Sequence, residues 1–163
     1  MAGKWLQLLR EIAPHVKRVL VLQSPNNPNW PGWLHAIDSS ATAMSLAVVR
    51  GSVTDRAQVE LVISKFAREP NGGLLVLPDP FLAPQRDLIL SSAARYRLPA
   101  IYGGAGFDNG DGLIYYGADS TDFPRYAAIY VDRILKGESP ANLNAFRVFR
   151  GPGRPAFPRV PRP

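Results

Sequence analysis

Apolar residues follow two alternating patterns along this chain, one with a helical period and one without interruption. Between Trp5 and Ile12 they recur three and four positions apart, which predicts an amphipathic helix over residues 3–13 that ends at Pro14. The run VLVL at 19–22 contains no polar residue and is typical of a strand buried on both faces. The chain therefore opens with a helix followed by a buried strand.

The same alternation continues as far as Gly137. Four further helices are expected at 33–44, 55–66, 84–96 and 123–136, and four further strands at 46–49, 73–77, 99–102 and 113–116. Asp55, three residues before Gln58, is a typical helix N-cap. This order predicts an α/β fold: a doubly wound, mostly parallel five-stranded sheet with helices on both faces. The link 103–112 is shorter than a usual parallel crossover, so the direction of the fifth strand stays open.

The composition is that of a single globular domain. The 163 residues are 46% hydrophobic and 20% charged, and no run reaches the roughly 20 apolar residues of a membrane-spanning helix. The chain has no cysteine, which excludes disulfides, thiolate metal sites and a cysteine nucleophile. Because every periodic segment ends by Gly137, we expect the α/β domain to occupy residues 1–144.

The positive charge is concentrated at the end of the chain. The net charge is +6, but residues 145–163 hold five arginines and no acidic residue, which leaves residues 1–144 almost neutral. Five of the 16 prolines also lie in this segment, so we expect an Arg/Pro-rich, disordered tail. Since the folded body carries little net charge, the composition does not predict a nucleic-acid-binding protein.

Polar and aromatic residues gather in the loops that follow the predicted strands. In an open parallel sheet these loops meet at one edge, where ligands bind. The residues placed there are Asn26, Asn27, Asn29, Trp30, Asp79, Tyr102, Tyr116 and Asp119. Amides, carboxylates and aromatic rings suit a small polar or aromatic solute. Taken one at a time, these residues are also typical turn formers and helix caps, an alternative that the sequence leaves open.

The sequence contains no recognisable catalytic motif. His15 and His35 lie in different predicted elements without metal-ligand spacing, and no nucleophile elbow, Walker A or dinucleotide-binding motif occurs. Asp79 stands where a phospho-receiver domain has its aspartate, but the neighbouring loops lack the further carboxylates and the lysine that such a site needs. The sequence therefore predicts no catalytic residue, no metal and no cofactor.

Several segments together resemble one family. They are GKWLQLLREIAPHVKRVLVLQSPNNP, FAREPNGGLLVLPDPF, RDLI, RYRLPAIY, GLIYYGAD and YVDRILKGESPANL, in order between residue 3 and about residue 143. They resemble the second half of an ABC-transporter substrate-binding protein, within the group that includes tryptophan/tyrosine-type solute receptors. The resemblance implies a type I periplasmic binding protein, in which two α/β lobes close over a solute. This chain would be mainly the second lobe, with an ABC permease as its partner and without catalysis.

The resemblance also implies which residues face the solute. Carried over by position, the ligand-binding residues are Ser24, Asn26, Asn27, Asn29, Asp79, Tyr102, Tyr116 and Asp119. Asp79 is the expected partner of an ammonium or hydroxyl group. The chain departs from the family pattern in GGAGFDNGDG, which follows LPAIY, and in its Arg/Pro-rich end.

Other interpretations stay open. The sequence lacks the family's first lobe and export signal, and its tail is what a shifted reading frame would produce, so one alternative is a degenerate fragment without transport function. Another is a small regulatory or enzymatic domain on the same scaffold. The family is periplasmic and meets the membrane only through the permease, whereas a chain made as written would stay in the cytoplasm. In such receptors the helix at 123–136 would pack on the first lobe, so without that lobe its apolar residues Phe123, Tyr130 and Ile134 would favour self-association.

Overall fold

The computed structural model describes residues 2–25, 27–104, 107, 114–117 and 123–139 of the chain. The chain divides into two compact units, Met1–Tyr116 and Gly117–Pro163, and each is described by itself. The expected domain boundary near residue 144 and the tail at 145–163 lie outside the described residues, so both stay predictions.

The first unit is built on one five-stranded sheet in the order β2-β1-β3-β4-β5. The strands are β1 (Arg18–Gln23), β2 (Ala47–Ser52), β3 (Gly72–Val76), β4 (Ala100–Tyr102) and β5 (Ile114–Tyr115). Every neighbouring pair runs parallel, which confirms the predicted α/β class. β5 is parallel too, with Ile114 opposite Ile101, and this answers the question that the short link had left open.

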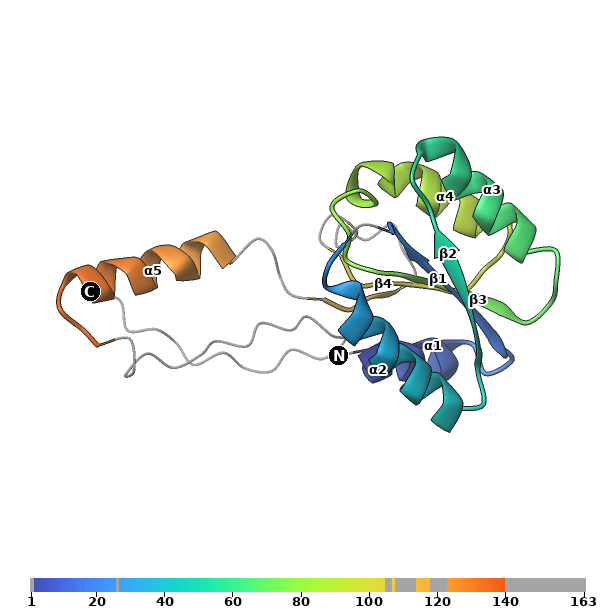
Figure 1. The fold of residues 1–163 in the computed structure, drawn as a ribbon, viewed down its shortest axis with the longest axis horizontal. Coiled ribbons are helices and arrows are strands. Elements are labelled where there is room, and N and C mark those ends of the chain that lie inside the picture. The colour runs from blue at the N-terminus through green and yellow to red at the C-terminus, as the bar shows by residue number, and fades with distance from the viewer. Residues whose placement is uncertain (1, 26, 105–106, 108–113, 118–122, 140–163) are drawn as a thin grey trace. The chain divides into compact units, whose positions relative to one another are not determined.

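Helices cover both faces of this sheet (Figure 1). They are α1 (Ala2–Ile12), α2 (Trp30–Ala43), α3 (Arg56–Phe66) and α4 (Arg86–Arg95), the last preceded by the 3₁₀ turn η1 (Ala83–Gln85). The pair α1 and α2 lies on one face and the pair α3 and α4 on the other (Figure 1). This is the doubly wound arrangement expected from the sequence.

β1 supplies side chains to both apolar layers, because successive residues of a strand point to opposite faces. Val19 and Val21 join the core cluster under α1 and α2, whereas Leu20 and Leu22 join the cluster under α3 and α4. All four side chains are buried. Full burial of such a side chain contributes about 1.5–3 kcal/mol, so the uninterrupted apolar run is what holds β1 at the centre of the sheet.

α2 begins at Trp30, three residues before the start that the apolar pattern predicted. Pro31 accounts for the difference, since its fixed φ suits the first helical turn, where its missing N–H would have had no partner within the helix. The earlier start brings the Trp30 ring into the core under α1 and α2, where it is 4% exposed. Trp30 is therefore anchored by packing as well as by its position next to the loop.

Asp55 caps α3 as the sequence predicted. Its Oδ1 accepts a hydrogen bond from the Gln58 backbone N–H at 2.9 Å, and Gln58 Nε2 donates to its Oδ2 at 2.8 Å. Gln58 Oε1 in turn accepts from the Thr54 backbone N–H at 3.1 Å. A cap of this kind stabilises a helix by about 1 kcal/mol and fixes where α3 starts.

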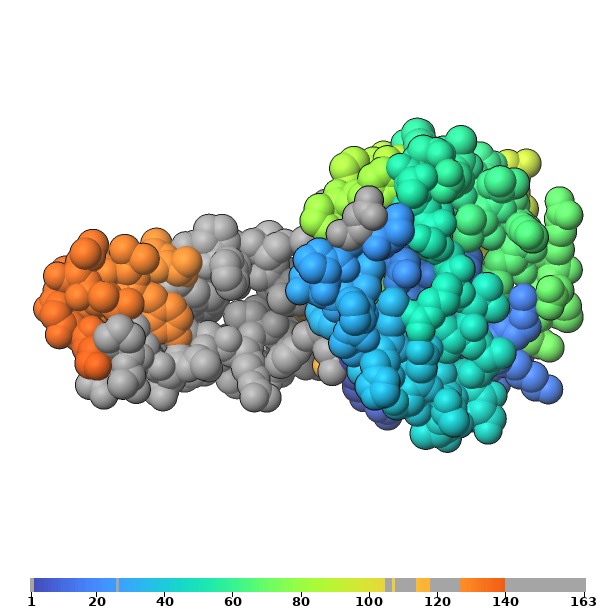
Figure 2. Space-filling model, viewed as in Figure 1, coloured from blue at the N-terminus to red at the C-terminus, as the bar shows by residue number. Residues whose placement is uncertain are grey.

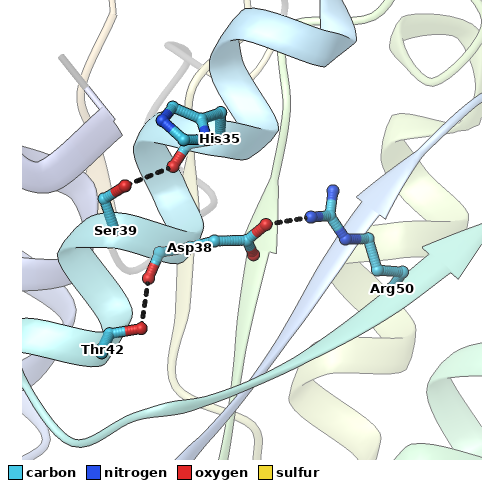
Figure 3. Close-up of polar contacts among 5 residues, drawn as sticks. All are labelled: His35, Asp38, Ser39, Thr42 and Arg50. Carbon is cyan, nitrogen blue, oxygen red and sulfur yellow. Dashed lines mark hydrogen bonds and ion pairs between the residues drawn. The ribbon is translucent and has the colours of Figure 1, made fainter.

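β2 forms one edge of the sheet and is exposed along most of its length. In the space-filling view β2 lies at the surface between α2 and α3 (Figure 2). Arg50 on this edge reaches α2 and forms an ion pair with Asp38 (Figure 3). On α2 itself, the hydroxyls of Ser39 and Thr42 donate to backbone carbonyls one turn earlier (Figure 3). The edge strand thus carries a charged side chain next to the exposed Val49.

The second unit contains the helix α5 (Phe123–Leu135). The helix ends at Leu135, and Gly137 follows with φ of +93° and donates its N–H to the Ile134 carbonyl at 3.0 Å. Glycine adopts this left-handed conformation without steric cost, so the predicted C-terminal signal is confirmed. Among the described side chains of α5, Val131, Ile134 and Leu135 are exposed apolar residues.

Candidate functional site

The carboxyl ends of all five strands lie at one edge of the sheet, because the strands are parallel. The loops after β1, β3, β4 and β5 therefore begin at that edge, which is where open α/β sheets bind ligands. Six of the eight residues predicted for the site are described there: Ser24, Asn27, Asn29, Asp79, Tyr102 and Tyr116. Asn26 and Asp119 lie outside the described residues.

Ser24 and Asp79 join the loops after the two central strands β1 and β3. The Ser24 backbone N–H and Oγ both donate to Asp79 Oδ2, at 2.9 and 2.6 Å. Asp79 Oδ1 accepts from the Phe81 backbone N–H at 2.8 Å, and the Asp79 side chain is buried. Hydrogen bonds to an ionised carboxylate are stronger than neutral ones, so the carboxylate holds both loops in place. Its expected role as partner of a solute's ammonium stays a prediction.

Asn27 and Asn29 shape the turn between β1 and α2. The Asn29 backbone N–H donates to Asn27 Oδ1 at 3.0 Å, and the Trp30 backbone N–H donates to the Asn27 carbonyl at 3.1 Å. The Asn29 side chain makes no capping bond to α2 and is exposed. Asn27 thus stabilises the turn, as expected for a turn-forming residue, while the side-chain amide of Asn29 faces solvent.

Trp30 ties the start of α2 to the same loop. Its Nε1 donates to the Ser24 carbonyl at 2.7 Å, and its ring meets that of Trp33 edge-on, with centroids 6.0 Å apart. Trp33 lies in turn 5.3 Å from Trp5 on α1. Ser24, at the start of the loop after β1, is therefore held by both Asp79 and Trp30.

Tyr102 belongs to the core rather than to the open edge. It is 2% exposed, and its ring stacks on Phe107 with centroids 4.8 Å apart and planes 10° from parallel. Burial raises the pKa of the Tyr102 hydroxyl to about 12. Because the ring is buried, a direct contact between a solute and Tyr102 stays a prediction.

Tyr116 lies directly after β5 and is partly buried. Its carbonyl accepts a hydrogen bond from Trp5 Nε1 at 2.6 Å, and its side chain packs against the core cluster under α1 and α2. The edge strand β5 is thereby attached to α1. This contact joins residues 111 positions apart, and no local pattern of residues indicates it.

Gln23 is a site residue that the sequence reasoning missed. It ends β1 and is 7% exposed, and none of the described residues forms a hydrogen bond with its Oε1. It borders a cavity of about 430 Å³, which is lined by Gln23, Pro25, Asn27, Pro28, Trp30, Pro31 and Leu34. The signal was available, since Gln23 is the polar residue that closes an apolar strand at its carboxyl end.

The part of the chain that the structure describes contains no group of three metal-ligating side chains. Nor does any helix within the described ranges have the length and apolarity needed to cross a membrane. The described site is therefore built from hydroxyl, amide and carboxylate groups and from aromatic rings.

Comparison with known proteins connects this arrangement to a family. A family model described as ABC transporter substrate binding protein matches residues 1–151. No protein of curated function matched the chain in a sequence comparison.

Solved structures share the fold. A conserved domain protein from Vibrio cholerae superposes with a TM-score of 0.73 at 21% identity, over 88% of this chain and 48% of that chain. The ABC domain from Streptococcus pneumonia in complex with L-Trp gives 0.74 at 19% identity, over 91% and 52%. The substrate-binding protein CD0873 from Clostridium difficile gives 0.65 at 23% identity, over 86% and 47%. The chain spans about half the length of these structures.

Proposed function

The chain belongs to the ABC transporter substrate-binding protein family, and from that premise we propose that it supplies one lobe of a solute receptor for an ABC importer. The observation that carries the proposal is the Ser24–Asp79 contact, which holds the loops after the two central strands at the carboxyl edge of the sheet. Loops fixed in this way give a solute prearranged polar groups, so less conformational entropy is lost on binding.

The solute that suits these loops is amino-acid-like or aromatic. The exposed amide of Asn29 both donates and accepts hydrogen bonds, and the first turn of α2 lies beside it. Trp33, which is partly exposed, provides aromatic surface near the loop. The Streptococcus structure holds L-Trp, which supports this solute class for a lobe of the same fold.

We assign the predicted residues two kinds of role. Ser24, Asn26, Asn27, Asn29, Tyr116 and Asp119 are proposed to contact the solute. Asp79 is proposed to act by positioning the Ser24 loop, with an ammonium group as its candidate partner, because its carboxylate already accepts three hydrogen bonds. Tyr102 is proposed to support the site from the core.

The experiment is a titration of the ¹⁵N-labelled full chain with the natural amino acids and simple sugars, followed by NMR. We expect L-tryptophan and related amino acids to shift the backbone signals of Ser24, Asn27 and Asn29. Closure of two lobes buries most of a solute, so one lobe should bind in the millimolar range, about 4–6 kcal/mol weaker than a micromolar receptor.

A matched pair of variants makes this titration decisive. Asn29→Ala removes an exposed amide beside α2 and should weaken binding severalfold, whereas Asp87→Asn changes an exposed residue on α4 and should leave it unchanged. No shifts at the strand-end loops with any tested solute, or equal binding by both variants, would overturn the solute-binding proposal. The fragment without transport function would then be the better interpretation.

The remaining partners follow from the family. We propose that the solute is handed to an ABC permease in the periplasm and that the chain performs no catalysis, because substrate-binding proteins of this family deliver solutes unchanged. The experiment is co-purification of the full chain with candidate permease subunits in detergent. Retention that depends on the solute would support the proposal, and failure to bind any candidate would contradict it.

Self-association through α5 stays a prediction. Apolar surface is exposed along the described part of that helix at Val131, Ile134 and Leu135. Burying this surface against a second copy of the chain would stabilise a dimer through the hydrophobic effect. Light scattering should show dimers whose fraction falls in Ile134→Lys. A monomer at all concentrations would contradict it.

A further inference from the structure

The amino ends of β1, β2, β3 and β4 lie at the edge of the sheet opposite the candidate site, because these strands are parallel. Backbone hydrogen bonds join the turns that lead into the strands. The Lys17 N–H donates to the Asn71 carbonyl at 2.9 Å, and the Lys17 carbonyl accepts from the Ala47 N–H at 2.9 Å. We call this surface the amino edge; its described residues are 10–18, 43–47, 65–71 and 95–99.

The amino edge has a surplus of positive charge. Five of its exposed basic side chains form no ion pair within the described ranges: Arg10, Lys17, Lys65, Arg68 and Arg97. Its other two arginines are paired, Arg18 with Glu69 at 3.1 Å and Arg95 with Glu60 at 3.3 Å. Glu11 is the remaining acidic residue among those of this surface. Residues 1–144 as a whole are almost neutral, so the surplus belongs to the amino edge rather than to the entire domain.

The helix ends explain only part of this charge. Cations are favourable at helix C-termini, and Arg10 and Lys65 lie in the last turns of α1 and α3. Lys17, Arg68 and Arg97 lie beyond the helix ends, in the turns that lead into β1, β3 and β4. The effect of the helix dipole falls off within the last turn, so it does not account for these three residues.

Arg97 stands at a position where glycine would be more stable. Its φ is +51°, and the N–H of the next residue, Leu98, donates to the Ala93 carbonyl at 2.9 Å. This is a common way for a helix to end, and glycine is the usual residue there because a Cβ atom is strained in the left-handed conformation. A strained residue of this kind points to a role other than stability.

The charges of the amino edge are spread over a surface and do not converge on a point. They come from the ends of α1, α3 and α4 and from the start of β1, on both faces of the sheet. Helices pack about 10 Å from the layer beneath them, so this surface is on the order of 20 Å across. A small anion is bound by donors that converge on it, which this arrangement does not provide.

A flat anionic surface matches this arrangement better than a nucleic acid does. Backbone N–H groups and helix N-termini make many of the phosphate contacts of nucleic-acid-binding proteins, whereas the described helices of this domain direct their C-terminal ends to the amino edge. An anionic bilayer attracts each basic side chain separately over the whole contact area. Ile12, 39% exposed at the end of α1, adds an apolar side chain that suits the bilayer interface.

We propose that the amino edge docks on a bilayer that contains anionic phospholipids, with Lys17, Arg68 and Arg97 as its principal contacts. This contact is additional to the one that the family makes through the permease. It does not use the candidate solute site, which lies at the opposite edge of the sheet.

The test is co-sedimentation of the full chain with vesicles of phosphatidylcholine, either alone or mixed with phosphatidylglycerol. We expect binding to the mixed vesicles that weakens as salt is added, because ions screen exposed charges. The five arginines of residues 145–163 would also be attracted to these vesicles, so variants of the amino edge must decide the matter.

Two double variants remove the same charge from different places. Lys17→Gln with Arg68→Gln should weaken binding roughly 20- to 30-fold, since each basic residue near an anionic bilayer strengthens binding about fivefold. The control is Arg50→Gln with Arg56→Gln, at the exposed edge strand β2 and at the start of α3. It should weaken binding by less than about threefold, because charges beyond a Debye length of about 8 Å are largely screened. Equal losses in the two double variants would overturn the proposal.

Arg97→Gly separates binding from stability. Glycine suits the left-handed conformation, so the urea midpoint of this variant should rise, while its binding to mixed vesicles should weaken about fivefold. A residue with a merely structural role would not change vesicle binding. Unchanged binding in Arg97→Gly would therefore contradict the proposal.

A short DNA duplex distinguishes a bilayer surface from a nucleic-acid surface. If Lys17→Gln with Arg68→Gln weakens DNA binding more than vesicle binding, the amino edge is a nucleic-acid surface and the bilayer proposal is wrong. A smaller effect on DNA than on vesicles would support the bilayer. None of these outcomes decides the proposed solute binding, because that titration reports on the loops at the opposite edge of the sheet.

Discussion

Ser24 and Asp79 lie 55 positions apart in the chain, yet Ser24 donates two hydrogen bonds to one carboxylate oxygen of Asp79. The contact joins the ends of β1 and β3, which are neighbours at the centre of the sheet. The second oxygen accepts from the Phe81 N–H, so one buried carboxylate orders two loops. Any change at Asp79 should therefore act on the whole candidate site rather than on one solute contact.

Asp79→Asn should destabilise the fold. The amide keeps the shape of the carboxylate but loses its charge and turns one acceptor into a donor, which leaves buried N–H groups without a partner. We expect a loss of about 2–4 kcal/mol in the free energy of unfolding, measured by urea denaturation. Asp87→Asn on the exposed face of α4 is the control and should change stability by less than about 0.5 kcal/mol. Equal stability of wild type and Asp79→Asn would contradict this role.

The sequence predicts the elements of this domain well because buried positions recur with the period of the helix or strand that contains them. The VLVL run of β1, the cap at Asp55 and the glycine after α5 were each interpreted correctly from local residue types. The apolar pattern predicts the start of α2 three residues too late, because Trp30 and Pro31 have the local signature of a loop. Proline in a first turn and proline in a loop have the same local signature.

The candidate site was predicted less completely, because its contacts join residues far apart in the chain. The loops that contain Ser24 and Asp79 could be placed by the rule for parallel sheets, but their hydrogen bonds depend on side-chain orientation. Tyr102 ends a strand and was expected at the open edge, whereas its ring packs on Phe107. Gln23 was missed although it is the polar residue that closes an apolar strand, because it belongs to no motif with a characteristic spacing.

Gly103 approaches α1 so closely that a side chain would not fit. A Cβ atom there would lie 2.6 Å from the ring of Trp5, and Trp5 is fixed by its hydrogen bond to the Tyr116 carbonyl. Gly103→Ala should therefore lower the free energy of unfolding by about 1–3 kcal/mol. Gly32→Ala is the matched control: apart from its chain neighbours and the backbone of its own helix, no atom lies within 4 Å of the added Cβ, and alanine in α2 should stabilise by about 0.5–1 kcal/mol. Two variants of equal stability would refute the close packing.

Stability should fall at alkaline pH through Tyr102. Burial raises the pKa of its hydroxyl from 10.0 to about 12, so the folded state favours the protonated form. The stability that the protonated Tyr102 hydroxyl contributes is fully present below pH 10. It is lost as the pH rises from 10 to 12, because the hydroxyl of the unfolded chain releases its proton at a lower pH than that of the folded chain. Urea denaturation across that range should show a shallower decline for Tyr102→Phe than for the wild type. Identical slopes for the two proteins would be evidence against the buried hydroxyl.

Arg50 protects the open edge of the sheet more than it stabilises the fold. Its ion pair with Asp38 is partly exposed, and such pairs contribute about 0–1 kcal/mol, so Arg50→Val should change the free energy of unfolding little. The variant would place a second apolar residue next to Val49 on an unpaired edge strand, where other chains can add their own strands. Light scattering should therefore show concentration-dependent association for Arg50→Val. Arg95→Val, which breaks an exposed pair with Glu60 between α3 and α4, should stay as monomeric as the wild type. If both variants associate equally, the effect comes from general surface hydrophobicity and the edge of β2 has no special part in it.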